Sequence, residues 1–267
     1  MEWMCCKRPE APVTTVLFDF DGTISTLRCG WEEVMEPLMV ELLGEDFRTM
    51  VQKYIDESTG IQTIFQMKWL AEQMRSGGGI ADDPWKYKEE YNRRLIKPVM
   101  ERRRRISDGS SSPDEYMIKG SRELLEMLTE SGIALYVASG TDDADVKQEV
   151  AALGLEEYFT DIKGAPEARE ECSKEAVIRA LIEEKGVTGE KLAVVGDGKV
   201  EITIGKENGA RTLGLATDEI KRFGINPIKR KRLIKAGADA ITGDFSDIAA
   251  LREFFTDVGK NQQERNE

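Results

Sequence analysis

A short apolar run that ends in two carboxylates constrains the fold of this chain more than any other feature. The segment Val16–Thr23 reads Val-Leu-Phe-Asp-Phe-Asp-Gly-Thr. An apolar run followed by a turn is typical of a buried strand in a parallel sheet, and such sheets bind their ligands at the carboxyl ends of the strands. Side chains two positions apart on a strand share a face, so Asp19 and Asp21 are expected to point the same way. Because two carboxylates that close repel each other, the segment predicts a metal site.

The chain is long enough, at 267 residues, for one large α/β domain or for a core with an inserted second unit. No apolar run approaches the length that crosses a bilayer. Residues 1–12 include charged side chains and lack the apolar core of a signal peptide. We therefore expect a cytoplasmic protein.

The net charge of −12 argues against nucleic acid as a partner, because proteins bind it through an excess of Lys and Arg. Two local basic runs, 102–105 and 229–232, are interpreted as solvated helix faces or ends. Histidine is absent, which excludes His-assisted triads and His-ligated zinc. The four cysteines lack zinc-site spacing and are interpreted as free thiols: Cys5, Cys6, Cys29 and Cys172.

Between residues 25 and 116 the apolar positions recur at helical spacing, and no β-rich run interrupts them. Apolar stripes over 31–42 and 61–74 predict two helices, and Pro37 predicts a kink or a fresh start in the first. Asp83-Pro84 predicts the start of a third helix, with an N-cap acid followed by proline at the first helical position. Roughly ninety residues of helix have the size of a domain.

After a polar, turn-rich loop at 107–113, strands and helices alternate. This rhythm requires crossover connections and predicts an α/β fold, a Rossmann-like doubly wound parallel sheet with an inserted all-helical unit. The start of the chain is expected to be loose. We assign 13–24 and 117–260 to the α/β core, 25–116 to the helical unit and 261–267 to a disordered tail. Strands are expected at 133–138, 159–162, 192–195, 211–215 and 238–242, and helices at 121–129, 143–153, 174–184, 200–208, 227–236 and 246–255.

Four segments of the chain resemble, in order, the four motifs of the haloacid dehalogenase superfamily in its phosphatase form. They are Asp19–Thr23, then Ser139-Gly140-Thr141 after a strand, Lys174 at a helix start, and Gly196-Asp197-Gly198-Lys199-Val200-Glu201 after another strand. Lys163 competes with Lys174 for the third motif. The helical unit between the first two motifs resembles the cap of phosphoglycolate phosphatase-like and β-phosphoglucomutase-like members.

This resemblance implies a role for each matching residue. Asp19 is the expected nucleophile, which forms an aspartyl-phosphate, and Asp21 is the expected acid and base. Phosphate is expected to bind at Gly22, Thr23, Ser139, Gly140 and Lys174. The expected metal residues are Asp19, Asp21, Asp197 and Glu201, and the last of these is expected to orient a metal-bound water or a neighbour.

The charged residues of the motifs indicate which metal is bound and which kind of bond is cleaved. A set of carboxylates without histidine is a hard-oxygen site, which suits Mg²⁺. Members of the superfamily that release halide or cleave phosphonates lack the second acid, so Asp21 favours phosphate esters. Glu201 departs from the Asp that is more usual at its position.

We therefore expect a Mg²⁺-dependent phosphohydrolase that acts on a small phosphorylated metabolite. A phosphomutase of the β-phosphoglucomutase type is the alternative, and a non-catalytic phosphoacceptor or binding protein on the same scaffold is a third hypothesis. Four residues of the helical unit are candidates to reach the substrate: Arg28, Tyr91, Arg93 and Arg94. Only two chain crossings join this unit to the core, so it is expected to move as a body about hinges near Ile24 and Tyr116.

Overall fold

The computed structural model describes residues 1–4, 11–59, 61–165, 183, 186–187 and 189–256. The helix predicted at 174–184, Lys174 as the expected motif lysine, and the predicted tail at 261–267 fall outside this description, except for Glu183.

A seven-stranded sheet forms the centre of the α/β part, with the strand order β1-β7-β6-β5-β2-β3-β4. All neighbouring strands pair in parallel except β1, which pairs antiparallel with β7. This result confirms the predicted α/β fold with a mostly parallel sheet. The strands are β1 (Glu2–Trp3), β2 (Thr15–Phe18), β3 (Ala134–Asp142), β4 (Asp161–Ala165), β5 (Leu192–Gly196), β6 (Arg211–Leu215) and β7 (Ala240–Thr242).

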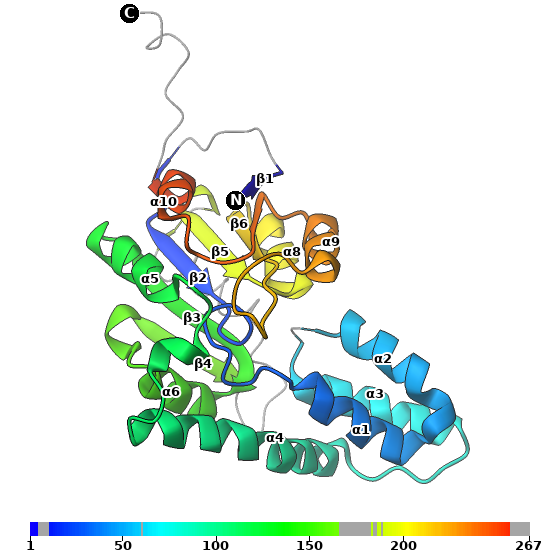
Figure 1. Cartoon of the computed structure of the whole chain (residues 1–267). Coiled ribbons are helices and arrows are strands. Elements are labelled where there is room, and N and C mark those ends of the chain that lie inside the picture. The colour runs from blue at the N-terminus through cyan, green and yellow to red at the C-terminus, as the bar shows by residue number, and fades with distance from the viewer. Residues whose placement is uncertain (5–10, 60, 166–182, 184–185, 188, 257–267) are drawn as a thin grey trace, which may run out of the picture.

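Successive residues of the central strands pack on opposite faces of the sheet. Val16 and Phe18 join the hydrophobic cluster formed with α5 (Ser121–Glu130), α6 (Asp143–Ala152) and α10 (Ile248–Thr256). Leu17 belongs to a second cluster, which includes Ile204 of α8 (Lys199–Glu207). Helix α9 (Pro227–Ala236) packs beside α8. Figure 1 shows α5 and α10 on one side of the sheet and α8 and α9 on the other, so both faces are covered.

The inserted helices bury a hydrophobic cluster of their own, separate from those of the sheet. It draws on Met35 and Met39 of α1, Val51 of α2, Leu70 of α3 and Leu95 of α4. In Figure 1, α1 to α3 lie beside the α/β part, and α4 runs from them to α6, which it contacts. The four helices are α1 (Glu32–Leu43), α2 (Arg48–Glu57), α3 (Thr63–Ser76) and α4 (Pro84–Ser107).

The start of α4 is the one the sequence predicts. The Asp83 carboxylate accepts a hydrogen bond from the backbone N–H of Trp85 at 3.1 Å, and Pro84 occupies the first helical position. An N-cap of this kind satisfies a donor that the helix itself leaves unpaired. The helix continues to Ser107, where the turn-rich loop begins.

Three features differ from the expectation. At the start of the chain, Glu2–Trp3 forms an edge strand that pairs with β7. Helix α2 lies between the two predicted stripes, where no separate helix is expected, and it buries Val51 and Ile55, which lie one helical turn apart. Pro37 does not begin a fresh helix but lies inside α1, where Met35 and Met39 are buried. Packing of that face outweighs the one hydrogen bond that proline removes.

Candidate active site

A cavity of about 110 Å³ lies where the carboxyl ends of β2, β3 and β5 meet the inserted helices. Residues from the two parts of the chain line it together. The α/β side contributes Asp19, Asp21, Gly22, Ser139, Gly140, Thr141, Asp142, Asp197 and Glu219, and the inserted segment contributes Arg28, Trp31, Thr59, Ile61, Thr63, Gln66, Lys88, Tyr91, Asn92 and Leu95.

Three carboxylates converge next to this cavity, and two of them, Asp19 and Asp197, line it. One oxygen from each of Asp19, Asp197 and Glu201 lies within 4.8 Å of the others, and all three residues are buried. Buried carboxylates at this spacing repel one another unless a cation joins them. Their hard oxygen atoms fit a divalent metal ion such as Mg²⁺ or Ca²⁺.

Glu201 also fixes the start of its own helix. Its Oε1 atom accepts a hydrogen bond of 2.7 Å from the backbone N–H of Gly198, at the N-cap of α8. A bond of this kind from the third helical position holds the carboxylate in place. The Glu201 side chain also packs closely against Gly196, since a Cβ added to Gly196 would lie 2.4 Å from it.

Asp21 faces a different set of partners. Its Oδ2 accepts hydrogen bonds from the Ser139 hydroxyl at 3.2 Å and from the Thr141 hydroxyl at 2.8 Å. Its side chain is therefore turned toward β3, while those of Asp19, Asp197 and Glu201 form the acidic cluster. Thr141 belongs to the second motif but is not among the residues that the sequence analysis expects in the site. The available signal was its position two residues after Ser139 on one strand, which places both hydroxyls on the same face.

Gly22 and Thr23 form the turn that follows Asp19 and Asp21. Gly22 has φ +73°, and a Cβ there would lie 2.7 Å from Asp197 Oδ2, so a side chain has no room. The buried Thr23 hydroxyl donates to Asp19 Oδ2 at 3.5 Å. Gly140 lines the cavity, but a Cβ on it would make only ordinary contacts with the backbone of Ile61 and Gln62.

A cation that the sequence analysis did not identify lies next to the acidic cluster. Lys229 of α9 is buried, and its ammonium group donates to Asp197 Oδ2 at 2.7 Å and to Glu219 Oε1. Burial lowers the pKa of Lys229, but the charges of Asp197 and Glu219 raise it further than that, so the residue keeps its charge. The interpretation of 229–232 as a solvated face is therefore wrong for Lys229. It is also wrong for Arg232, whose guanidinium donates to the Asp197 carbonyl at 3.3 Å.

Lys163, the competing candidate for the motif lysine, is about half exposed. It lies on β4, and its ammonium group pairs with Asp161 at 3.4 Å. It is absent from the described residues that line the cavity. The geometry therefore brings Lys229 to the site and leaves Lys163 outside it.

Arg28 connects the site to a buried acid. Its guanidinium donates to Glu149 Oε1 at 2.6 Å and to Asp145 at 3.2 Å, and its Nε lies 4.0 Å from Asp21 Oδ1. Burial lowers the pKa of Arg28, but these carboxylates raise it above its usual value. Arg28 thus remains a fixed positive charge beside Asp21.

Removal of the Arg28 charge is expected to destabilise the fold. Arg28→Met leaves Glu149 buried without its partner, and such a loss typically costs about 3–5 kcal/mol in the free energy of unfolding. The double variant with Glu149→Leu should recover most of this loss, because no unpaired charge remains. Urea denaturation measures both. Arg93→Met, an exposed arginine paired with Glu90, is the control and should change little.

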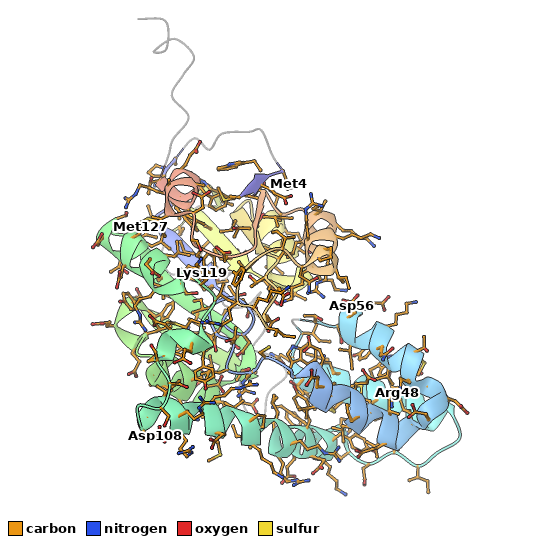
Figure 2. All side chains as sticks on the ribbon, in the orientation of Figure 1. Met4, Arg48, Asp56, Asp108, Lys119 and Met127 are labelled. Atoms are coloured by element: carbon orange, nitrogen blue, oxygen red, sulfur yellow. The ribbon has the colours of Figure 1, made fainter. Side chains whose placement is uncertain are left out.

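Polar contacts join the inserted helices to the α/β part on two sides of the cavity. From α4, Lys88 pairs with Asp142 Oδ1 at 2.5 Å and the Asn92 amide donates to Oδ2 of the same carboxylate at 3.0 Å. On the other side, Arg232 of α9 pairs with Asp56 at 3.1 Å. Figure 2 shows Asp56 at the end of α2 that faces the α/β part.

Two of the four candidate substrate residues reach the cavity. Arg28 and Tyr91 line it. Arg93 and Arg94 instead bind Glu90 on the surface of α4 and are not among the described lining residues. Cys29, the one cysteine within the described residues, is a free thiol as expected, and burial raises its pKa to about 11.

Comparison with known proteins agrees with this arrangement. A family model described as haloacid dehalogenase-like hydrolase matches residues 16–215. A 5'-nucleotidase of Pseudomonas aeruginosa is 22% identical over 240 residues, which cover 89% of this chain and 93% of that protein.

Solved structures share the fold over nearly the whole chain. A predicted phosphatase from Clostridium acetobutylicum superposes with a TM-score of 0.64 at 18% identity, over 90% of this chain and 98% of that one. A predicted phosphoglycolate phosphatase from Haemophilus somnus gives 0.62 at 17% identity, over 90% and 97%. A β-phosphoglucomutase from Clostridium difficile gives 0.58 at 15% identity, over 91% and 97%. In the described part of this chain, no helix combines the length and the apolar character that crossing a membrane requires.

Proposed function

Because the chain belongs to the haloacid dehalogenase-like hydrolases, we propose that it is a Mg²⁺-dependent phosphatase that forms an aspartyl-phosphate on Asp19. The observation that carries this proposal is the convergence of Asp19, Asp197 and Glu201 beside the cavity, which Asp19, Asp21 and Asp197 line. A nucleophile, an acid and a metal-binding cluster are the groups that hydrolysis of a phosphate ester by this route needs. Mg²⁺ bound at the cluster would offset the repulsion between these acids and an anionic substrate.

In the first half-reaction, an Asp19 oxygen attacks phosphorus and forms a new P–O bond as the bond to the leaving oxygen breaks. Asp21 donates a proton to that oxygen. In the second half-reaction, water attacks phosphorus, Asp21 takes a proton from it, and the bond to Asp19 breaks. The hydroxyls of Ser139 and Thr141 hold Asp21 in place for both transfers. Phosphate and the alcohol are the products.

We propose that residues 25–116 act as a cap over this site and that 13–24 and 117–260 form the core. The separate hydrophobic cluster of α1 to α4 supports this division, since a unit with its own core can move as a body. The contacts of Asp142 with Lys88 and Asn92 are suited to hold the cap against the core. Such a cap excludes water from the reaction.

The proposed substrate is a small phosphorylated metabolite. The cavity that would bind it is lined by aromatic and apolar side chains (Trp31, Tyr91 and Leu95) and by polar side chains such as Gln66. The named activities of relatives, a 5'-nucleotidase and a predicted phosphoglycolate phosphatase, suggest the first compounds of a substrate panel. Phosphate release from this panel tests the function. Conversion of a sugar phosphate to its isomer without phosphate release would identify a phosphomutase instead. Location in the cytoplasm stays a prediction.

Chelation should abolish activity, and added Mg²⁺ should restore it. Asp197→Asn is expected to weaken Mg²⁺ binding more than Glu201→Gln does, because Gln keeps the oxygen that accepts from Gly198. Loss of a partner that only orients a ligand costs about 10- to 100-fold in metal affinity, and loss of a ligand should cost more. Calorimetric titration of each variant with Mg²⁺ measures this. Equal losses would show that both carboxylates contact the metal directly.

A further inference from the structure

Lys229 occupies a position between two carboxylates that come from different loops. Asp197 follows β5 and Glu219 follows β6, and one oxygen of each accepts a hydrogen bond from the same ammonium group. Both carboxylates line the cavity. Their oxygens also meet at one point, since a Cβ on Gly22 would lie 2.7 Å from Asp197 Oδ2 and 3.1 Å from Glu219 Oε1.

The placement of Lys229 is built into α9. Asn226 caps the helix by accepting from the N–H groups of Ile228 and Lys229, which fixes the first turn against the end of the sheet. One turn later, Arg232 donates to the carbonyl of Asp197. The same helix therefore holds Asp197 by its side chain and by its main chain.

We propose that Lys229 is a resident counter-ion of the acidic site, which withholds Asp197 Oδ2 and Glu219 from the metal and weakens metal binding. This inference rests on the proposed function and assigns a role to a residue outside the four motifs. The ammonium group between Asp197 and Glu219 offsets their negative charge, so less of that charge remains to attract a metal ion. Glu219 is thereby kept as a partner of lysine rather than a further metal ligand. A phosphate ester that enters the cavity meets less negative charge as a result.

Two roles of Lys229, positioning Asp197 and supplying charge, predict opposite changes in metal affinity when Lys229 is replaced. If Lys229 only positioned Asp197, its loss would disorder a ligand and weaken metal binding. If it acts as a counter-ion, its loss leaves Asp197 and Glu219 with uncompensated charge close to the metal. Unit charges about 5 Å apart, at an effective dielectric constant of about 20, then change the affinity by roughly 10- to 100-fold or more.

The test is calorimetric titration of Mg²⁺ into the full chain and its variants. Lys229→Met keeps the length of the side chain without its charge and should bind Mg²⁺ at least about tenfold more tightly than the wild type. Glu219→Gln removes one negative charge and keeps an oxygen for Lys229, so it should bind Mg²⁺ more weakly. Lys229→Arg keeps the charge and should stay near the wild type. Lys231→Met, an exposed lysine of the same helix, is the matched control and should not change the affinity.

The outcomes separate this inference from the proposed function. Weaker or unchanged Mg²⁺ binding in Lys229→Met overturns the counter-ion role while leaving the phosphatase proposal intact. If Lys229→Met does not fold, Glu219→Gln decides, and an unchanged affinity in that variant overturns the role. Mg²⁺ binding that appears only in Lys229→Met supports it. If neither the wild type nor any variant binds Mg²⁺, both proposals fail.

Discussion

Asp19→Asn should abolish phosphate release from every substrate. The amide cannot attack phosphorus, so neither half-reaction takes place, and loss of a nucleophile costs on the order of 10⁴- to 10⁶-fold in rate. Hydrolysis of p-nitrophenyl phosphate in the presence of Mg²⁺ measures the loss. No phosphorylated protein should be found by mass spectrometry after an acid quench.

Stability provides the control for this variant. Asp19 lies in a cluster with Asp197 and Glu201, so removal of one charge relieves repulsion in the metal-free protein. The thermal midpoint without metal should therefore stay the same or rise. A variant that keeps a tenth of the wild-type rate while folded would show that another group is the nucleophile.

Asp21→Asn should give a burst of product followed by a stall. Asp19 is still present, and p-nitrophenolate leaves without needing a proton, so the first half-reaction survives. Attack by water lacks its base, which typically contributes about 10²- to 10⁴-fold. The variant should release about one p-nitrophenolate for each site and then hold phosphate on Asp19.

Mass spectrometry after an acid quench should locate the added phosphate on the peptide that contains Asp19. Ser139→Ala with Thr141→Val removes the two hydroxyls that bond Asp21 and leaves the acid itself, so it is the companion variant. It should slow both half-reactions without trapping the intermediate. Phosphate found on Asp197, or a full steady-state rate without a burst, would reverse the assigned roles of the two acids.

The sequence predicts the sheet and the motif positions well because both depend on local signals. Apolar runs such as Leu192–Val195 are short, buried on both faces and followed by glycine, so they are recognisable as strands. A strand as short as Glu2–Trp3 has no such run. It forms because β7 offers an unpaired edge, which is a property of the folded sheet.

Lys229 shows why part of the site could not be predicted. Four basic residues in a row give no period, so the sequence does not indicate which of them faces inward. Lys229 faces inward because the cap at Asn226 sets the rotation of α9. Two acids that lie 32 and 10 residues away in the chain, Asp197 and Glu219, then bind its ammonium group. A charged side chain is buried when groups of opposite charge pair with it, and these groups come together only in the folded protein.

Asp142 limits which inserted helices of a related protein could replace those of this chain. Its two oxygens bind residues one turn apart on α4, Lys88 and Asn92, and it follows directly after Thr141, which holds Asp21. A helical unit transplanted from another protein without these two side chains would leave this carboxylate without partners at the edge of the cavity. The strand end that orients Asp21 would then lose its anchor. The inserted helices are thus interchangeable as a module only together with the residue that follows the second motif.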